Sequence, residues 1–228
     1  MKQLALDIGL ASTPTLDNFF VGPNAAAIAH LRLWTSSQNR SPVPSYLWGE
    51  SGSGKTHLLH AVHHALKEQG GRIGWLDAHT LHPPEFDDDW TAVLMDDVHL
   101  YNTEQQHTAF NWFVNALTPR TGAPRWVLAA GALPPPDLKL RDDLRSRLGW
   151  GHVEVLKVLD EPERLAVLRQ EADARGLTLS EEVMAYMLNR FSRDLGSLMQ
   201  LLDHLDQYAL QTQRALTIPL VRAMLENA

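Results

Sequence analysis

Short apolar runs alternate with longer amphipathic segments along the first two thirds of the chain. The apolar runs have the length of buried strands and are found at 45–48, 72–76, 90–95, 126–130 and 153–158. Helical periodicity covers 57–69 and 104–117, and then continues through 161–174, 180–190, 194–213 and from 217 onward. Strands that alternate with helices predict an α/β fold with a five-stranded parallel sheet flanked by helices. The helical end of the chain predicts a small all-helical domain.

The change from short apolar runs to helical periodicity falls at about 158–162 and marks a domain boundary. We therefore predict a flexible N-terminal tail at 1–12, an αβα core at 13–158 and a helical domain at 159–228. Ser180, Asp194 and Thr217 are suitable N-cap residues for the later helices, because their side-chain oxygens can accept from a free backbone N–H.

The segment after the first strand predicts a phosphate-binding loop. It reads GESGSGKT over 49–56 and fits the pattern GxxxxGK[ST] between a strand and a helix. The glycines permit positive φ and a close backbone approach to phosphate, and the helix N-terminus adds partial positive charge. Lys55 is predicted to reach the β- and γ-phosphates, and the Thr56 hydroxyl to ligate Mg²⁺. The predicted nucleotide contacts are Gly49, Glu50, Ser51, Gly52, Ser53, Gly54, Lys55, Thr56 and His57.

The third apolar run ends in two acidic residues that complete this prediction. Asp96 and Asp97 follow the run about forty residues after the phosphate loop. A carboxylate at the end of a buried strand can hold Mg²⁺, and a neighbouring one can orient a water molecule toward the γ-phosphate. We assign the metal role to Asp96 and the water-orienting role to Asp97.

Composition narrows the class of protein. The 228 residues are 44% hydrophobic and 21% charged, as in ordinary globular domains. The chain has no cysteine, which excludes disulfides and thiolate metal sites, and it shows no signal peptide or membrane-spanning run. The cytoplasm is the expected location. The net charge of −7 argues against strong direct DNA binding, which depends on clustered Lys and Arg, and favours a protein partner.

Several segments resemble the bacterial replication initiator DnaA and, more closely, the Hda family of DnaA-related regulators, both of the AAA+ class. The segment 16–24, LDNFFVGPN, is similar to the family's opening motif, which cradles adenine. The resemblance therefore implies that Phe19, Val21 and Gly22 contact an adenine nucleotide, ATP or ADP. The helical end resembles the Hda lid, so we expect no DNA-reading domain like that of DnaA.

The resemblance also implies a partner and a catalytic role for one arginine. The segment 143–151, DLRSRLGWG, is similar to the motif that carries the family's arginine finger, which assigns that role to Arg147. A finger acts on a γ-phosphate held by a neighbouring molecule, and the resemblance implies that this molecule is DnaA. Arg145 lies two residues away and is a possible substitute. The sequence leaves a homodimer open.

The first residues are similar to the short motif with which Hda binds the DNA polymerase sliding clamp. The motif is QLALD at 3–7, in which Leu4 and Leu6 would enter an apolar pocket while the Gln3 amide satisfies polar groups at its rim. The preferred function is therefore an adaptor. Bound to the clamp, it would stimulate hydrolysis of DnaA-bound ATP and negatively regulate the initiation of chromosomal replication.

The sequence departs from the family at two positions that sense nucleotide. The fourth strand ends in AAGA at 129–132, where the family pattern expects a polar residue. In the lid, Gly196 stands at the sensor-arginine position, with Arg193 almost a turn earlier. We therefore expect weak intrinsic ATP hydrolysis.

Two other functions stay open from the sequence. The first is an active AAA+ ATPase that acts as an initiator or loads another replication protein, and the intact phosphate loop favours it. The second is a DNA-binding regulator of the DnaA type, which the acidic balance disfavours.

Overall fold

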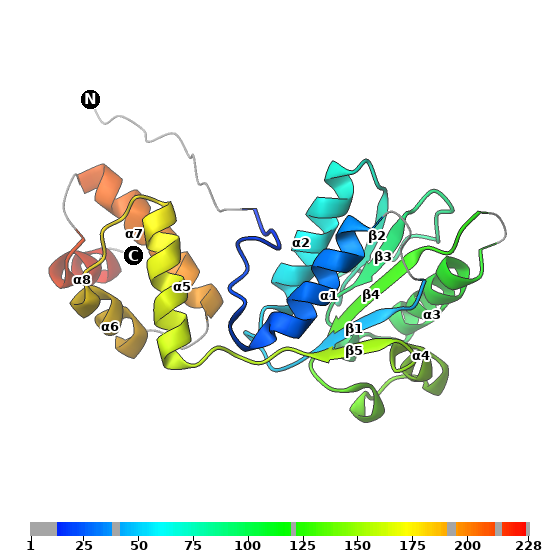
Figure 1. Cartoon of the computed structure of the whole chain (residues 1–228). Helices are drawn as coiled ribbons and strands as arrows, with labels where there is room; N and C mark the ends of the chain where they lie inside the picture. The colour runs from blue at the N-terminus through cyan, green and yellow to red at the C-terminus, as the bar shows by residue number, and fades with distance from the viewer. Residues whose placement is uncertain (1–12, 38–41, 120–121, 191–194, 213–215, 227–228) are drawn as a thin grey trace. The chain divides into compact units, whose positions relative to one another are not determined.

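The computed structural model describes residues 13–37, 42–119, 122–190, 195–212 and 216–226. It divides into two compact units, one covering Pro14–Val158 and the other containing the chain from Leu159 onward. Each unit has its own helices, and only the first has a sheet among the described residues (Figure 1).

The first unit is a parallel sheet with helices on both faces. Its strands are β1 (Ser45–Trp48), β2 (Ile73–Leu76), β3 (Ala92–Met95), β4 (Trp126–Gly131) and β5 (His152–Val155). Its α-helices are α1 (Ala25–Ser36), α2 (Lys55–Glu68), α3 (Thr103–Leu117) and α4 (Asp142–Leu148), and its 3-10 helices are η1 (Gly22–Asn24), η2 (Val98–Leu100) and η3 (Pro135–Asp137). The strand order is β2-β3-β4-β1-β5, and every neighbouring pair is parallel. The predicted five-stranded parallel sheet is confirmed.

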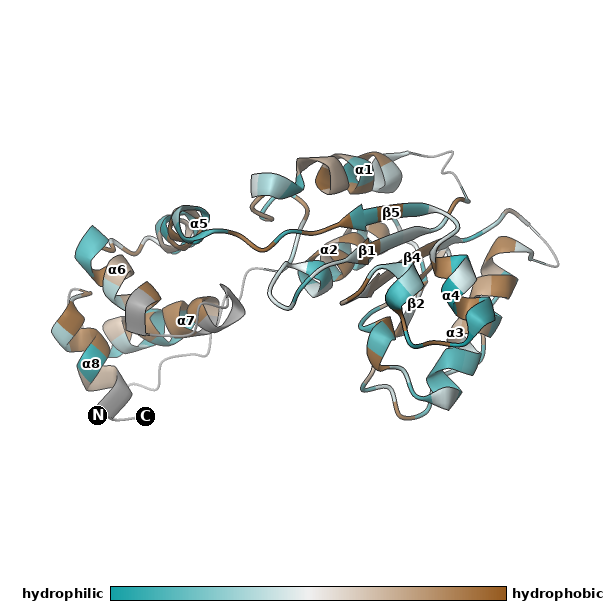
Figure 2. Ribbon diagram, turned by 90° about the horizontal axis from the view of Figure 1, so that it is seen from below, coloured by the Kyte–Doolittle hydropathy of each residue, from teal (hydrophilic) through white to brown (hydrophobic). Residues whose placement is uncertain are grey.

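Alternation along the strands divides the core between the two faces of the sheet. Leu47, Leu94 and Leu128 pack with α1 and α2 on one face. Their neighbours Tyr46 and Val127 pack with α3 and α4 on the other. Figure 2 shows α1 and the pair α3 and α4 on opposite sides of the sheet. This period of two is what a strand requires when both its faces are buried.

The strand register brings the ends of β1, β3 and β4 to one edge of the sheet. Trp48 lies beside Gly131, and Ala129 lies beside Met95. The phosphate loop follows β1, the acidic pair follows β3, and the AAGA segment ends β4. These three segments are therefore neighbours in space, although they are far apart along the chain.

The second unit is a bundle of helices around a leucine- and methionine-rich core. Its helices are α5 (Glu161–Ala174), α6 (Glu181–Arg190), α7 (Leu195–Thr212) and α8 (Ile218–Glu226). Ser180 Oγ accepts from Val183 N at 3.3 Å, as predicted for the N-cap of α6. Arg175, which is largely buried, is paired with Glu171 at 2.6 Å and Asp203 at 3.0 Å. The predicted cap Asp194 lies outside the described residues.

Several predicted boundaries were wrong by a few residues. Helix α2 begins at Lys55 rather than at 57, because the end of the phosphate loop is already the first turn of the helix. Strand β5 ends at Val155 rather than at 158, since its pairing with β1 ends at Trp48. No described helix combines the length and hydropathy needed to cross a membrane.

Candidate functional site

The phosphate loop joins β1 to α2 and has the backbone geometry that its glycines predicted. Gly52 and Gly54 have φ of 81° and 92°, in the left-handed region that side chains disfavour. Because Gly54 is the N-cap of α2, the backbone N–H groups of the first helical turn have no acceptor within the helix. A loop that presents such N–H groups at a helix N-terminus can bind a phosphate.

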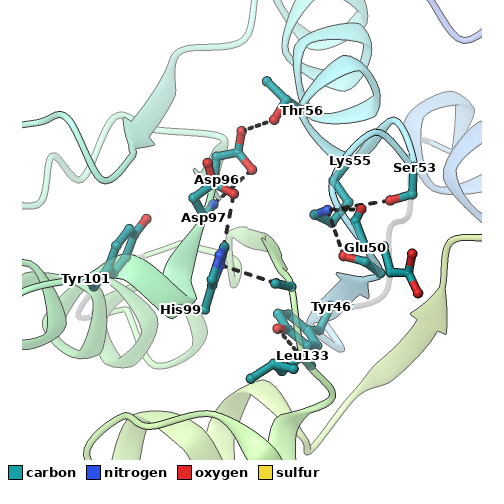
Figure 3. Close-up of polar contacts among 12 residues, drawn as sticks. Tyr46, Glu50, Ser53, Lys55, Thr56, Asp96, Asp97, His99, Tyr101 and Leu133 are labelled. Carbon is teal, nitrogen blue, oxygen red and sulfur yellow. Dashed lines mark hydrogen bonds and ion pairs between the residues drawn. The ribbon is translucent and has the colours of Figure 1, made fainter. Parts of the chain in front are cut away.

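Lys55 is 7% exposed and lies inside the loop (Figure 3). Its Nζ donates to the carbonyl oxygens of Gly49 and Glu50, both at 2.8 Å. Burial lowers the pKa of the Lys55 ammonium, and the carboxylates of Asp97 and Asp96 oppose that shift. A buried cation beside backbone donors is therefore available to a ligand with several negative charges.

The two acidic residues after β3 meet the start of α2. Thr56 Oγ1 donates to Asp96 Oδ2 at 2.6 Å, and Asp97 N donates to Asp96 Oδ1 at 2.9 Å. Asp96 is 4% exposed, and burial raises its pKa while the hydrogen bond from Thr56 opposes that rise. The residues predicted to hold Mg²⁺, Thr56 and Asp96, are thus brought together, with Asp97 beside them.

The predicted adenine-contacting segment lies against the phosphate loop. The Phe19 ring is 5.5 Å from the His57 ring, and a Cβ at Gly54 would meet Phe19 Cε2 at 2.6 Å. Val21 packs at the edge of the core on the same face of the sheet, and Gly22 begins η1 with φ of 42°. The structure therefore brings the opening motif and the phosphate loop together.

Sequence reasoning gave no individual role to Asn24. Its side chain joins the opening motif, 16–24, to the end of the first unit by two hydrogen bonds. Its Nδ2 donates to Lys157 O at 3.0 Å, and its Oδ1 accepts from Lys157 N at 2.8 Å. This pair spans 133 residues of sequence, so no local pattern could have revealed it.

The end of β4 is closed by Tyr46, a second residue that the sequence did not single out. Its hydroxyl donates to Leu133 O at 2.7 Å, and a Cβ at Gly131 would lie 2.3 Å from Tyr46 Oη. Burial raises the pKa of Tyr46, so the phenol keeps its proton and remains a donor. Tyr46 therefore fills the space that a side chain at Gly131 would need.

This packing predicts that a side chain added at Gly131 lowers stability, and that removing the Tyr46 hydroxyl restores part of it. We expect Gly131→Ala to lower the free energy of unfolding by about 1–3 kcal/mol, the usual effect of overpacking a core. Tyr46→Phe in the same background removes the hydroxyl, so the atoms nearest the new methyl become Val98 Cγ2 at 3.1 Å and the ring carbon Cζ at 3.3 Å. It should recover part of the loss in urea denaturation. Equal stability of wild type and Gly131→Ala would contradict this account of the strand end.

The predicted finger, Arg147, lies on α4, which packs on the face of the sheet opposite α1 (Figure 2) and α2. Its guanidinium stacks over the Phe110 ring of α3, 5.1 Å from the ring centroid. Arg141 is paired with Asp143 at 2.6 Å, and Arg145 with Asp142 at 2.7 Å. Within the described part of the chain, no carboxylate pairs with Arg147.

Arg147 and the phosphate loop belong to different elements, α4 and the connection from β1 to α2, and the finger role of Arg147 stays a prediction. The tail residues Gln3, Leu4 and Leu6 lie outside the described residues, as does Arg193, so their predicted roles stay predictions. Gly196 falls in the first turn of α7.

Comparisons with known families match both units. Residues 10–82 match the bacterial DnaA ATPase domain, and residues 160–225 match the lid domain of Hda.

Solved structures of DnaA and RuvB proteins share the fold. Domain III of the replication initiation protein DnaA from Thermotoga maritima has a TM-score of 0.77 at 23% identity, covering 95% of this chain and 97% of that chain. AMPPCP-bound DnaA from Aquifex aeolicus has a TM-score of 0.66 at 22% identity, covering 88% and 73%. A point mutant of RuvB from Thermotoga maritima has a TM-score of 0.65 at 17% identity, covering 94% and 72%. With the two family matches, this fold identifies the chain as an Hda/DnaA-related AAA+ protein.

Proposed function

We propose that this protein is an adenine-nucleotide-binding adaptor that stimulates hydrolysis of ATP bound to DnaA. In this role it is held at the DNA polymerase sliding clamp by residues 3–7 and presents Arg147 to the γ-phosphate of the neighbouring molecule. Loss of ATP from DnaA then represses further initiation of replication. The match of the second unit to the Hda lid supports this direction of regulation.

The observation that carries the proposal is the difference among three arginines of one segment. Arg141 and Arg145 have carboxylate partners, whereas the described residues offer Arg147 only the Phe110 ring. A guanidinium that leaves an ion pair to bind phosphate must give up that pair, and among the described residues Arg147 has none to lose. The contact with the face of the Phe110 ring is not an ion pair, so it does not compete with a bidentate contact between the guanidinium and phosphate oxygens.

The residues of the chain's own loop fit a nucleotide with Mg²⁺. The buried Lys55 ammonium and the positive φ at Gly52 and Gly54 suit a phosphate chain, and the oxygens of Thr56 and Asp96 are of the kind that Mg²⁺ prefers. Bound there, Mg²⁺ would neutralise charge on the β- and γ-phosphate oxygens. Phe19 and His57 would line the same site beyond the loop.

A reconstituted assay tests the proposal. DnaA is loaded with radiolabelled ATP and then mixed with clamp-loaded DNA and the purified protein, and ADP formation on DnaA is followed with time. We expect the protein to accelerate hydrolysis only when the clamp is present. Hydrolysis at the rate of DnaA alone would refute the adaptor function.

Deletion of residues 1–8 is expected to separate clamp binding from nucleotide binding. Because the proposed clamp contact comes from Gln3, Leu4 and Leu6, the deletion should abolish co-elution with the clamp. Affinity for ADP should not change, since the described nucleotide site begins later in the chain. A substitution of only Leu4 and Leu6 by Ala should reproduce the loss. Undiminished co-elution of the truncated protein would remove the tail from the proposal.

One observation favours an alternative, an active AAA+ ATPase. The contact between Thr56 and Asp96, with Asp97 beside it, is the arrangement that hydrolysis in the chain's own site would require. The two functions differ in turnover by the isolated protein. Rapid ATP hydrolysis without DnaA or clamp would favour the ATPase, and slow hydrolysis favours the adaptor.

A further inference from the structure

The His99 imidazole lies between the acidic pair and the end of β4 (Figure 3). Its Nδ1 is 3.2 Å from Ala132 N and 4.0 Å from Asp97 Oδ1. The chain reaches this position through Asp97, the one non-glycine among the described residues with positive φ, at 48°. Such a backbone conformation is costly for a side chain, and it persists where surrounding contacts require it. At Asp97 this conformation turns the chain into η2, which places His99 beside the ends of the strands.

The hydrogen bond to Ala132 determines which nitrogen of the ring carries the proton. A backbone N–H can only donate, so Nδ1 of His99 must accept, and the neutral ring then has its proton on Nε2. The contact with Asp97 Oδ1 at 4.0 Å is too long to reverse this assignment. Nε2–H has no acceptor among the residues that the structure describes, and the side chain is 22% exposed. His99 therefore carries a free donor beside Asp97.

A nucleotide sensor at the end of β4 would need a hydrogen-bond donor from elsewhere in the chain. Tyr46 occupies the space of a side chain at Gly131, and the segment 129–132 contains only Ala and Gly. The phenol hydroxyl is itself committed to Leu133 O. Among the described residues, the imidazole of His99 is the side chain that hydrogen-bonds the backbone at Ala132.

We propose that His99 Nε2–H replaces the missing sensor of β4 and contacts the γ-phosphate of a nucleotide bound at the phosphate loop. The inference rests on the nucleotide site proposed above and extends it, because it makes that site distinguish a triphosphate from a diphosphate. Figure 3 shows His99, Asp96 and Asp97 grouped on the side of the site opposite Lys55. A γ-phosphate lies farther from the loop than a β-phosphate, so the Nε2–H of His99 would meet the third phosphate.

Two isosteric variants separate the two nitrogens of the ring. In His99→Asn the amide oxygen can take the position of Nδ1 and accept from Ala132 N, but no donor remains at the position of Nε2. In His99→Gln the longer side chain places its amide near the position of Nε2. His99→Ala removes both nitrogens. The exposed His82, on the connection between β2 and β3, provides the matched control His82→Asn.

The measurement is affinity for ADP and for AMPPCP, a non-hydrolysable ATP analogue, by competition against a fluorescent ADP in the presence of Mg²⁺. We expect His99→Ala and His99→Asn to weaken AMPPCP binding about 10- to 100-fold, the range for a lost hydrogen bond to a charged group. ADP binding should change less than about 2-fold. ADP has no γ-phosphate, so the variants remove no hydrogen bond to it. His99→Gln should retain part of the preference, and His82→Asn should match wild type.

The possible failures are distinguishable. If wild type binds neither nucleotide, the proposed nucleotide site itself is wrong, whatever the His99 variants do. If wild type binds both and the His99 variants keep its ratio of affinities, or lose both affinities equally, the sensor role is overturned. Thermal unfolding of each variant shows whether a loss of affinity reflects a loss of fold.

Discussion

Arg147→Ala is expected to abolish stimulation of hydrolysis of DnaA-bound ATP. An arginine supplied in trans stabilises the charge of the transition state and raises the rate by about 10³- to 10⁵-fold, so its loss should bring the rate near that of DnaA alone. Clamp binding and ADP affinity should be unchanged, because Arg147 lies on α4, which packs on the face of the sheet opposite α2. The assay is ADP formation on radiolabelled DnaA at saturating protein.

Arg145→Ala is the matched control for this experiment. Arg145 lies on the same helix two residues away, and its guanidinium is paired with Asp142. This variant should keep most of the stimulation. Arg147→Lys should recover little, since an ammonium lacks the planar fork of guanidinium donors. Stimulation by Arg147→Ala equal to that of wild type would remove the finger role, and loss with Arg145→Ala alone would transfer it to Arg145.

Lys55→Ala is expected to weaken binding of both ADP and AMPPCP by about 100-fold or more, because charge-assisted hydrogen bonds to phosphate are among the strongest in proteins. The substitution also leaves the carbonyl oxygens of Gly49 and Glu50 without their buried donor, which loosens the loop. Equilibrium dialysis with each nucleotide measures both losses. His99 variants, in contrast, should affect only the triphosphate.

Lys67→Ala is the control for this substitution. Lys67 is exposed in the last turn of α2, so it tests removal of one positive charge from the same helix without touching the loop. Its nucleotide affinities should equal those of wild type. Nucleotide binding by Lys55→Ala at wild-type affinity would show that the ligand of this protein is held elsewhere.

The local parts of the site follow from the sequence because each depends on neighbours in the chain. A strand, a glycine-rich loop and a helix in immediate succession predicted the phosphate loop, and its Gly52 and Gly54 have the positive φ expected of them. The meeting of Thr56 with Asp96 was predictable as well, since the carboxyl ends of parallel strands share one edge of a sheet. The first turn of α2 was missed because the loop pattern masks the start of helical periodicity.

The sequence by itself determined the alternation of strands and helices, the helical second unit and the residues of the phosphate loop. Only the tertiary structure decided that Tyr46 fills the space beside Gly131, that His99 reaches Ala132, and that the Arg147 guanidinium lies over the Phe110 ring. The physical reason is distance along the chain. Periodicity and motif spacing report interactions between near neighbours, whereas the bond from Tyr46 to Leu133 joins residues 87 positions apart. Such contacts form only when the whole sheet has been assembled.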